Sequence, residues 1–536
     1  MHSTVWSKSL DVTAGGQGIV SHAGVVLLRA LADRTGLTSG LSKALARRRF
    51  IPLHDRGRVL ADLAVAIADG AAVISDFAVL AGQREVLGPV ASVPTVWRAL
   101  EEIAGGGKAT ARRVTAAVNA ARIRAWEGIV ARHGQMPGVR IADKVLDGVI
   151  CIRLDATVTP ACSEKEGAEA NFKGFGHHPL LAYCDNTDEA LAGMMRPGGA
   201  GSNTATDHLR VLDEAITAVP AKYRRKLMVT VDGAGASHDL IKYLDKLAAR
   251  RGYQLTYSVG WALGERERDA VTGVPAQAWE QAVDGRGEVR ERRADDACAG
   301  RDCGHRRCWV EEAHVTELTA LLRQGRGGDQ LAAWPESMRV FARRERPHPG
   351  AQLTLFETRD GWRYTLWVSN LPAAERGWRS RVTYIDAAHR VHARVEDRIR
   401  TGKDCGIGHF PSRSLAINTA WLTASLLALR SWPGCGAWPS TATWPKPSRR
   451  RSATASCMPA PGSSAALAAA SCESPPPGHG PATSQQPGSR SPPCPRRPDQ
   501  QARACRQERT PSRGQWNPGT RPASRAAGIP GDPETR

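Results

Sequence analysis

Three acidic residues stand where a carboxylate can serve chemistry and is not needed for the core. Asp155 ends the apolar segment VICIRLD, and Asp232 ends KLMVTVD and is followed by GAGAS. Glu396 lies much further along the chain, among the arginines of HARVEDRIRTGKDCG. Strand ends in α/β sheets open onto the ligand crevice, and grouped carboxylates hold divalent cations there. For each aspartate the alternative is an Asx turn or a cap that closes a strand.

Glu396 belongs to a segment, residues 386–403, whose pattern predicts a helix. Helical neighbours recur three, four and seven residues apart. By this spacing three cationic or potentially cationic side chains share a face with Glu396: His389, His392 and Lys403. Carboxylates in such a setting hold Mg²⁺ while the flanking cations hold phosphates. The alternative is a solvated helix on which Glu396 pairs with Arg400, one turn further on.

Composition points to an anionic partner. The chain has 536 residues and a formal net charge of +20, and nucleic acid is the commonest partner of so basic a protein. The start, MHSTVWSKSLDV, has no apolar core of a signal peptide, and no apolar run reaches the roughly 20 residues of a membrane span. The twelve cysteines are scattered, unlike a disulfide scaffold. We therefore expect a cytoplasmic protein, associated with the nucleoid and not with a membrane.

The composition changes near residue 430. Residues 431–536 contain one Leu, one Ile and 20 of the 34 prolines, with 14 Lys and Arg against 5 acids. Such a segment cannot bury enough apolar surface to offset its ordering entropy, so we predict a disordered tail. If the tail is read back into GC-rich codons, a reading frame shifted by one base can encode an amphipathic helix that continues residues 418–430. This indicates that the tail is an out-of-frame extension; the alternative is a basic tail that helps to bind DNA.

Before the tail the chain alternates between helical and strand-like periods. Residues 22–135 read as helices. The order that follows is three strands, helix, strand, helix, strand, a long insert, and two helices, which predicts an α/β sheet domain. The insert has its own strand candidates, MRVFARRERP, QLTLFET and RYTLWVSNLP.

Five segments follow from this order. They are a helical N-terminal domain (1–140), the first part of the core (141–262), a β-rich insert (263–383), the last part of the core with the Glu396 helix (384–430) and the tail (431–536).

The motifs around the three acids resemble those of a known family. RLDATV, TVDGAGAS and VEDRIRTGKD are similar to the motifs of DDE transposases of bacterial insertion sequences. FKGFGHHPLLAYCDN, LAGMMRPGGAGSNTATDH and RRERPHPGAQL resemble the branch called insertion sequence thirteen-eighty, and the likeness covers roughly residues 15–430. It implies a ribonuclease-H-like core with the first Asp on the first strand, the second just after the fourth, and the Glu on a helix after a β-strand insert.

The related transposases often carry a Tyr, Arg, Glu, Lys signature on that helix. Glu396 and Lys403 fit its last two positions, whereas His389 stands at the Tyr position and His392 at the Arg position. Two arginines off the motif spacing are candidates for the missing guanidinium: Arg390 and Arg394.

The resemblance implies phosphoryl transfer with two divalent ions, Mg²⁺ or Mn²⁺, held by Asp155, Asp232 and Glu396. Lys403 would grip a DNA phosphate near the cleaved bond, and the basic N-terminal helices would bind the element ends. The implied partners are double-stranded DNA, as terminal inverted repeats and target, and a second copy of the chain. The DNA contacts expected along the helix are Lys403, His392, Arg394, Arg400 and His389.

Two other functions share these features. One is a decayed transposase that only binds DNA, and the other is a ribonuclease-H-like nuclease that cuts without joining. A separate candidate is the segment CAGRDCGHRRC, where Cys298, Cys303 and Cys308 approach the spacing of a zinc site. The alternative for that segment is a charged loop in the insert.

Overall fold

The structure is a computed structural model that describes most of the chain up to residue 436. The described residues are 22, 24–171, 173–201, 204–233, 236–289, 312–324, 328–347, 351–371 and 381–436, without the side chains of 85, 86 and 431–436. All of them lie in the first of two compact units, Met1–Glu473. The tail beyond residue 436 and the cysteines 298, 303 and 308 lie outside the described residues, so the predictions about them stay predictions.

The N-terminal region is helical, as predicted. Its helices are α1 (Val25–Arg34), α2 (Leu37–Leu45), α3 (Arg56–Ala68), α4 (Ala78–Ala81), α5 (Arg84–Leu87), α6 (Val93–Gly105) and α7 (Gly107–His133). The stretch 21–49, which reads as one helix, is divided at Gly36, whose φ of 70° breaks the helical path between α1 and α2. Asp55 then starts α3 by accepting a hydrogen bond from the Arg58 amide.

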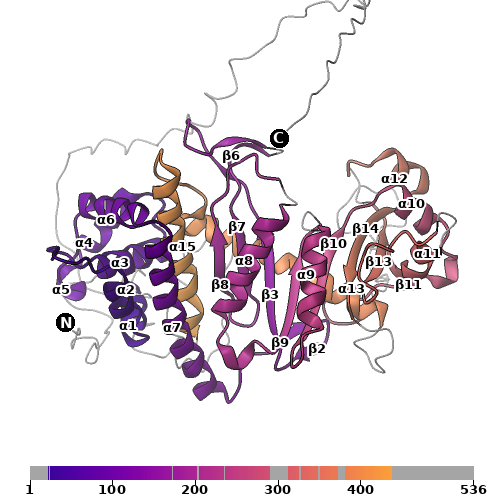
Figure 1. Cartoon of the computed structure of the whole chain (residues 1–536), viewed down its shortest axis with the longest axis horizontal. Helices are drawn as coiled ribbons and strands as arrows, with labels where there is room; N and C mark the ends of the chain where they lie inside the picture. Colours follow the sequence, from indigo (N-terminus) through magenta and orange to yellow (C-terminus); the bar gives the residue numbers. More distant parts are fainter. Residues whose placement is uncertain are drawn as a thin grey trace, which may run out of the picture. The chain divides into compact units, whose positions relative to one another are not determined.

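The centre of the fold is a mixed sheet. The core strands are β3 (Ile150–Ala156), β7 (Leu180–Cys184), β8 (Glu189–Met194), β9 (Lys226–Val231) and β10 (Gln254–Trp261). They are ordered β8-β7-β3-β9-β10, with β9 parallel to both β3 and β10, and β7 antiparallel to β3 (Figure 1). This is the strand order and direction of a ribonuclease-H-like core, which confirms the predicted fold.

The insert extends the same sheet beyond β10. It adds β14 (Arg363–Ser369), β13 (Arg339–Glu345), β12 (Ala313–Glu317) and β11 (Glu280–Gln281), each antiparallel to its neighbour. The strand expected at QLTLFET is wrong, since these residues lead into helix α12 (Leu355–Asp360). The reason is a capping box, in which Thr354 and Glu357 each bond the other's backbone amide. Two short helices complete this region, α10 (Glu265–Thr272) and α11 (Thr319–Arg323).

The two faces of the sheet carry different helices. Alternate residues such as Ile152 and Val229 form one core with α8 (Ala205–Ala218) and α9 (His238–Ala248). The residue before each of these, Cys151 in β3 and Met228 in β9, faces the other side of the sheet and packs against α13 (Val382–Arg390). Because side chains alternate between faces along a strand, every second residue of β3 and β9 points toward the side that carries α13.

The last described helix, α15 (Leu415–Gly436), ties the N-terminal helices to the sheet. It contacts α1, α3 and α6 and also β8 (Figure 1). Trp421 of α15, Leu63 of α3 and Leu181 of β7 belong to one apolar cluster. The helical region and the sheet therefore share a core, and the predicted boundary at residue 140 stays a prediction.

Smaller elements lie beside the core. A two-stranded ribbon is formed by β1 (Val139–Ile141) and β2 (Lys144–Leu146). A three-stranded sheet contains β4 (Thr159–Pro160), β5 (Glu169–Asn171) and β6 (Gly174–His177). Within the ranges given above, no helix combines the length and the apolar character that crossing a membrane requires.

Candidate active site

Asp155 and Asp232 are neighbours at one edge of the sheet. In the parallel pair β3–β9, Leu154 is in register with Val231, so the next residues on the two strands are the two aspartates. Asp155 is two residues from Arg153, and Asp232 is two residues from Thr230, so both share the face of those side chains. Adjacent strands are roughly 5 Å apart, which brings two acids together at the carboxyl ends of β3 and β9.

Glu396 comes from the helix α14 (Arg394–Gly402), which contacts β3. Val395 and Ile399, four residues apart, are buried in the shared apolar cluster and fix one side of α14. Glu396 lies outside that apolar stripe and is exposed. Its carboxylate has no hydrogen bond or ion pair with any residue that the structure describes.

The pKa of Asp155 reflects its burial and the charges of the other two acids. Burial raises this pKa from 3.8 to about 7, and the charges of Asp232 and of Glu396 add to the increase. A hydrogen bond from the Ala156 amide and the charge of Lys173 act in the opposite direction. Three carboxylates from separate stretches of the chain thus repel one another, and such a cluster needs cations to be fully ionised at neutral pH.

Two lysines supply part of that positive charge. Lys403 follows α14 directly and is half-buried. Burial and the charge of Lys173 lower its pKa, while Asp155 raises it, so all three groups are within electrostatic range. Lys403 is the expected phosphate contact of the sequence analysis. Lys173, in the turn between β5 and β6, was not singled out there.

The segment after Lys403 is distorted and firmly held. Residues 403–407 form a π-type turn in which Gly406 has a φ of 84°. The indole of Trp421 donates to the Gly406 carbonyl at 2.7 Å, and the Thr159 hydroxyl donates to the Ile407 carbonyl at 2.9 Å. A Cβ at Gly406 would approach the Ser425 hydroxyl to 2.6 Å, so this backbone path requires glycine. These contacts fix where Lys403 leaves the helix.

The salt-bridge alternative for Glu396 does not match the structure. Arg400 pairs with Asp397 at 2.7 Å, three residues away on the exposed side of α14. The arginine that might have neutralised Glu396 is therefore engaged with the neighbouring acid. Glu396 acts electrostatically on Asp155 instead.

A buried ionic cluster joins α14 to the sheet. Asp185, just after β7, and Arg153 of β3 are fully buried and form an ion pair. Asp185 also pairs with Arg398 and, at 3.3 Å, with Arg394. Burial alone would raise the pKa of Asp185, but the arginines outweigh it and hold the pKa at about 2. One carboxylate therefore ties two residues of α14 to β3, which fixes the helix that carries Glu396.

Two of the expected DNA contacts do not lie on the exposed face. Residues 391–393 form a 3-10 turn, so 386–403 is not one regular α-helix and the seven-residue spacing fails. His392 is buried with its Nδ1 2.9 Å from the Thr230 hydroxyl, and His389 stacks on Trp367 with its Nδ1 2.9 Å from the Ser258 hydroxyl. Burial lowers the pKa of each imidazole to about 3. Both imidazoles are neutral and already contact hydroxyl groups of the sheet, so neither is available to bind a DNA phosphate.

The remaining expected contacts differ in accessibility. Arg394 is partly exposed but donates to Asp185 and to the Arg140 carbonyl at 2.8 Å. Arg400 is well exposed beside Asp397. Of the cations on α14 and just after it, Arg400 and Lys403 are therefore the better placed to meet a phosphate.

Divalent ions fit this donor set by charge. Carboxylate oxygens are the ligands that Mg²⁺ and Mn²⁺ prefer, and a cation would favour the ionised form of Asp155, whose pKa is raised by burial and by the charges of Asp232 and Glu396. Among the residues described, however, no three Asp, Glu, His or Cys side chains form a ready metal-binding group.

Sequence reasoning missed Asp185 and Lys173. Asp185 ends the predicted strand PLLAYCD much as Asp155 ends VICIRLD, so the same strand-end signal was present for both. The signal cannot tell a carboxylate with three arginine neighbours from one that faces other acids. Lys173 lies in a turn without any periodic pattern, so no comparable signal existed.

Comparisons with known proteins identify the family of the chain. The family model described as "Transposase DDE domain group 1" matches residues 2–431. A chain in the cryo-EM structure of the piggyBac transposase synaptic complex with hairpin DNA is 11% identical, with a TM-score of 0.37; the match covers 87% of this chain and 85% of that one. A structural likeness at that level carries no weight in assigning the family. A search of curated proteins found no match. On the family match over most of its length, the chain belongs to the DDE transposases of domain group 1.

Proposed function

We propose that this protein cuts DNA at the ends of an insertion sequence and joins those ends to target DNA, with Asp155, Asp232 and Glu396 as the catalytic acids. The observation that carries the proposal is the raised pKa of Asp155, caused by burial and by the charges of the other two acids. Burial by itself also raises a carboxyl pKa, to about 6 at Asp386 despite its pairing with Arg343, so what distinguishes Asp155 is the added charge of Asp232 and Glu396. A group of acids that destabilise one another is retained for a ligand and not for the fold.

The residues have separate tasks in this proposal. Asp155 and Asp232 follow residues that are in register on adjacent strands, and α14, which contacts β3, would supply Glu396 to the same site. These three would hold two Mg²⁺ or Mn²⁺ ions, which when bound activate the attacking oxygen and stabilise the leaving oxygen. Lys403, beside Asp155, is placed to bind a phosphate next to the scissile bond. Asp185 holds α14 and acts through Glu396 as a positioning residue.

The reaction moves one phosphoryl linkage in each step. An oxygen of water, or the 3′-hydroxyl of the element end, forms a bond to the scissile phosphorus, and the 3′-oxygen of the cut strand leaves with the bonding pair. The polyanionic backbone must approach three carboxylates, so the lysines beside the site reduce the repulsion. Duplex DNA is the proposed partner, two protomers would bridge two element ends, and the proposed place of action is the nucleoid in the cytoplasm.

Joining of a labelled DNA end tests the proposal. Purified protein would be incubated with Mg²⁺ or Mn²⁺, a labelled duplex carrying the element end and an unlabelled plasmid. A transposase transfers the label to the plasmid, a nuclease only shortens the labelled duplex, and a decayed protein binds the duplex without changing it. Label transfer by the wild type that Asp232→Asn abolishes, with duplex binding retained, is the expected result. Cleavage without transfer, or transfer by Asp232→Asn, would overturn the proposal.

A further inference from the structure

The loop between α2 and α3, residues 46–55, presents cationic and apolar side chains together, and we call it the arginine loop. Arg47, Arg48 and Arg49 follow one another and are all exposed. A bridge between Arg47 and Phe50 closes a tight turn around the other two. Arg49 has a φ of 66°, a conformation that a long side chain adopts at a cost in energy.

Two apolar residues of the loop have almost no protein around them. Ile51 is 97% exposed and Leu53 is 95% exposed. Phe50 differs, since the Arg56 guanidinium lies over its ring at 5.9 Å. The loop is thus anchored at Phe50 and leaves Ile51 and Leu53 for a partner. Isolated exposed apolar residues are common. Two at nearly full exposure beside three arginines indicate a surface that contacts a partner.

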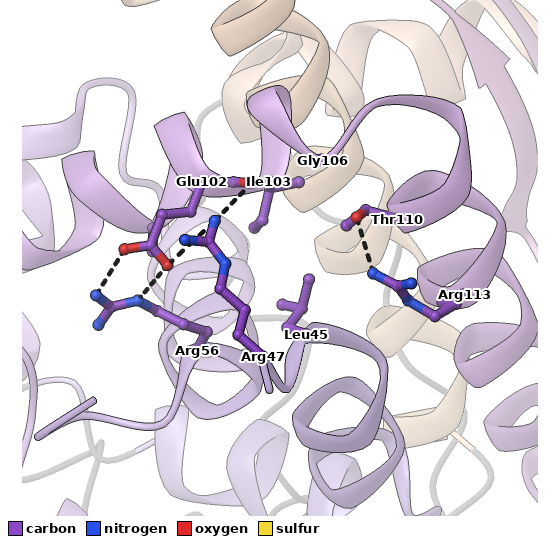
Figure 2. A pocket seen from close by; sticks show the side chains of 9 residues that line it. Leu45, Arg47, Arg56, Glu102, Ile103, Gly106, Thr110 and Arg113 are labelled. Carbon is purple, nitrogen blue, oxygen red and sulfur yellow. Dashed lines mark hydrogen bonds and ion pairs between the residues drawn. The ribbon is translucent and has the colours of Figure 1, made fainter. Parts of the chain in front are cut away.

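The base of the loop is rigid and basic. Arg56 donates to both carboxylate oxygens of Glu102, at 2.9 and 2.8 Å, and this contact lowers the pKa of Glu102. Beside this pair is a small open pocket lined by Arg47, Arg56 and Arg113 (Figure 2). Arg113 is held by the Ala44 carbonyl at 2.9 Å and by the Thr110 hydroxyl at 3.0 Å. One acid therefore faces several guanidinium groups that the fold has oriented beforehand.

We infer that the arginine loop is a contact surface for duplex DNA, with its arginines on phosphates and with Ile51 and Leu53 against the sugars or bases of a groove. The charge of the loop selects a polyanion, and guanidinium groups suit phosphate oxygens. Proteins that enter the minor groove combine arginines with apolar side chains that press against the base steps. An anionic lipid surface and a second copy of this chain are the other occupants that the test distinguishes.

This inference rests on the proposed function and assigns part of its DNA binding to a surface separate from the three acids. Two paired variants test it, with binding of the full-length protein to a fluorescent duplex measured by anisotropy over a range of salt concentrations. Arg48→Ala with Arg49→Ala removes two phosphate contacts, so the slope of log affinity against log salt should fall by about 1.8. Arg250→Ala with Arg251→Ala, which removes two exposed arginines after α9, is the matched control and should leave the slope unchanged.

The apolar half of the loop is tested separately. Ile51→Ser with Leu53→Ser should weaken binding roughly tenfold or more at every salt concentration and keep the wild-type slope, because apolar contact is lost and charge is not. Both side chains are exposed, so the melting temperature should not fall. Light scattering measures whether the loop variants lose dimer mass. Binding to vesicles that contain phosphatidylserine measures whether they lose affinity for an anionic lipid surface.

The possible outcomes are distinct. Wild-type DNA affinity and slope in both loop variants would overturn the inference, and so would a loss confined to dimer mass or to vesicle binding. If the wild type binds and cleaves DNA while the loop variants bind equally well, only this inference fails. If the wild type neither binds nor cleaves DNA, the proposed function fails.

Discussion

Asp155→Asn should make the metal-free protein more stable at alkaline pH, which is unusual for a change at a proposed catalytic residue. In the folded protein the pKa of Asp155 is about 7, against 3.8 for an unperturbed carboxyl. Between these values the folded state keeps the proton that the unfolded state releases, so stability falls as pH rises from about 4 to about 7. Above pH 7 both states are ionised and the loss is complete. Asparagine cannot ionise and avoids the loss.

The size of the effect follows from the pKa. Each pH unit corresponds to about 1.4 kcal/mol, so the two units between pH 5 and the folded pKa give about 3 kcal/mol as an upper value. The advantage of the variant over the wild type in free energy of unfolding should therefore grow by up to about 3 kcal/mol from pH 5 to pH 8. Taking the difference between variant and wild type cancels the titration of every group that does not interact with Asp155.

Urea unfolding at pH 5, 6, 7 and 8 in the presence of a chelator measures this difference. The control is Asp397→Asn, because Asp397 is exposed and paired with Arg400, and its difference from the wild type should stay nearly constant. Added Mg²⁺ should stabilise the wild type more than Asp155→Asn, since only the wild type keeps all three acids. A difference for Asp155→Asn that is flat between pH 5 and pH 8 would refute the convergence of the three carboxylates.

Three further predictions follow from the same contacts. Asp185→Asn should destabilise the protein by about 3–5 kcal/mol in urea unfolding, because it leaves the buried Arg153 without its counter-charge; an effect below 1 kcal/mol, on the order of a surface pair, would argue against the cluster. His389 and His392 should stay neutral from pH 5 to pH 8, so their imidazole NMR shifts should not titrate, and a midpoint near 6.5 would contradict their burial. Lys403→Met should weaken DNA cleavage while leaving the melting temperature within about 2 °C, and unchanged cleavage would remove Lys403 from the site.

The core of the fold could be predicted because its strands are short, apolar and closed by turn residues. The order of strands and helices after residue 141 gave the sheet, and the register of β3 with β9 then brings Asp155 next to Asp232. The insert was harder. In QLTLFET the apolar alternation favoured a strand, but the capping box at Thr354 and Glu357 was the stronger local signal and produced a helix.

The face of the helix that carries Glu396 could not be read from its spacing. A seven-residue repeat is meaningful only along a regular α-helix, and the 3-10 turn at 391–393 changes the phase before Glu396. His389 and His392 therefore meet hydroxyls of the sheet. Tertiary partners such as Thr230 and Ser258 come from distant parts of the chain, and a local pattern carries no information about them.

The position of Glu396 is the central claim, and Glu396→Gln tests it most directly. Glutamine keeps the shape and the helix propensity and removes only the charge. Cleavage of the element's end DNA with Mg²⁺ or Mn²⁺ should fall below about a tenth of the wild-type rate, a barrier increase of at least 1.4 kcal/mol, while the free energy of unfolding changes by no more than about 0.5 kcal/mol. Asp397→Asn, on the next residue of α14, should cleave like the wild type. A Glu396→Gln protein that is less stable yet still cleaves would contradict the account.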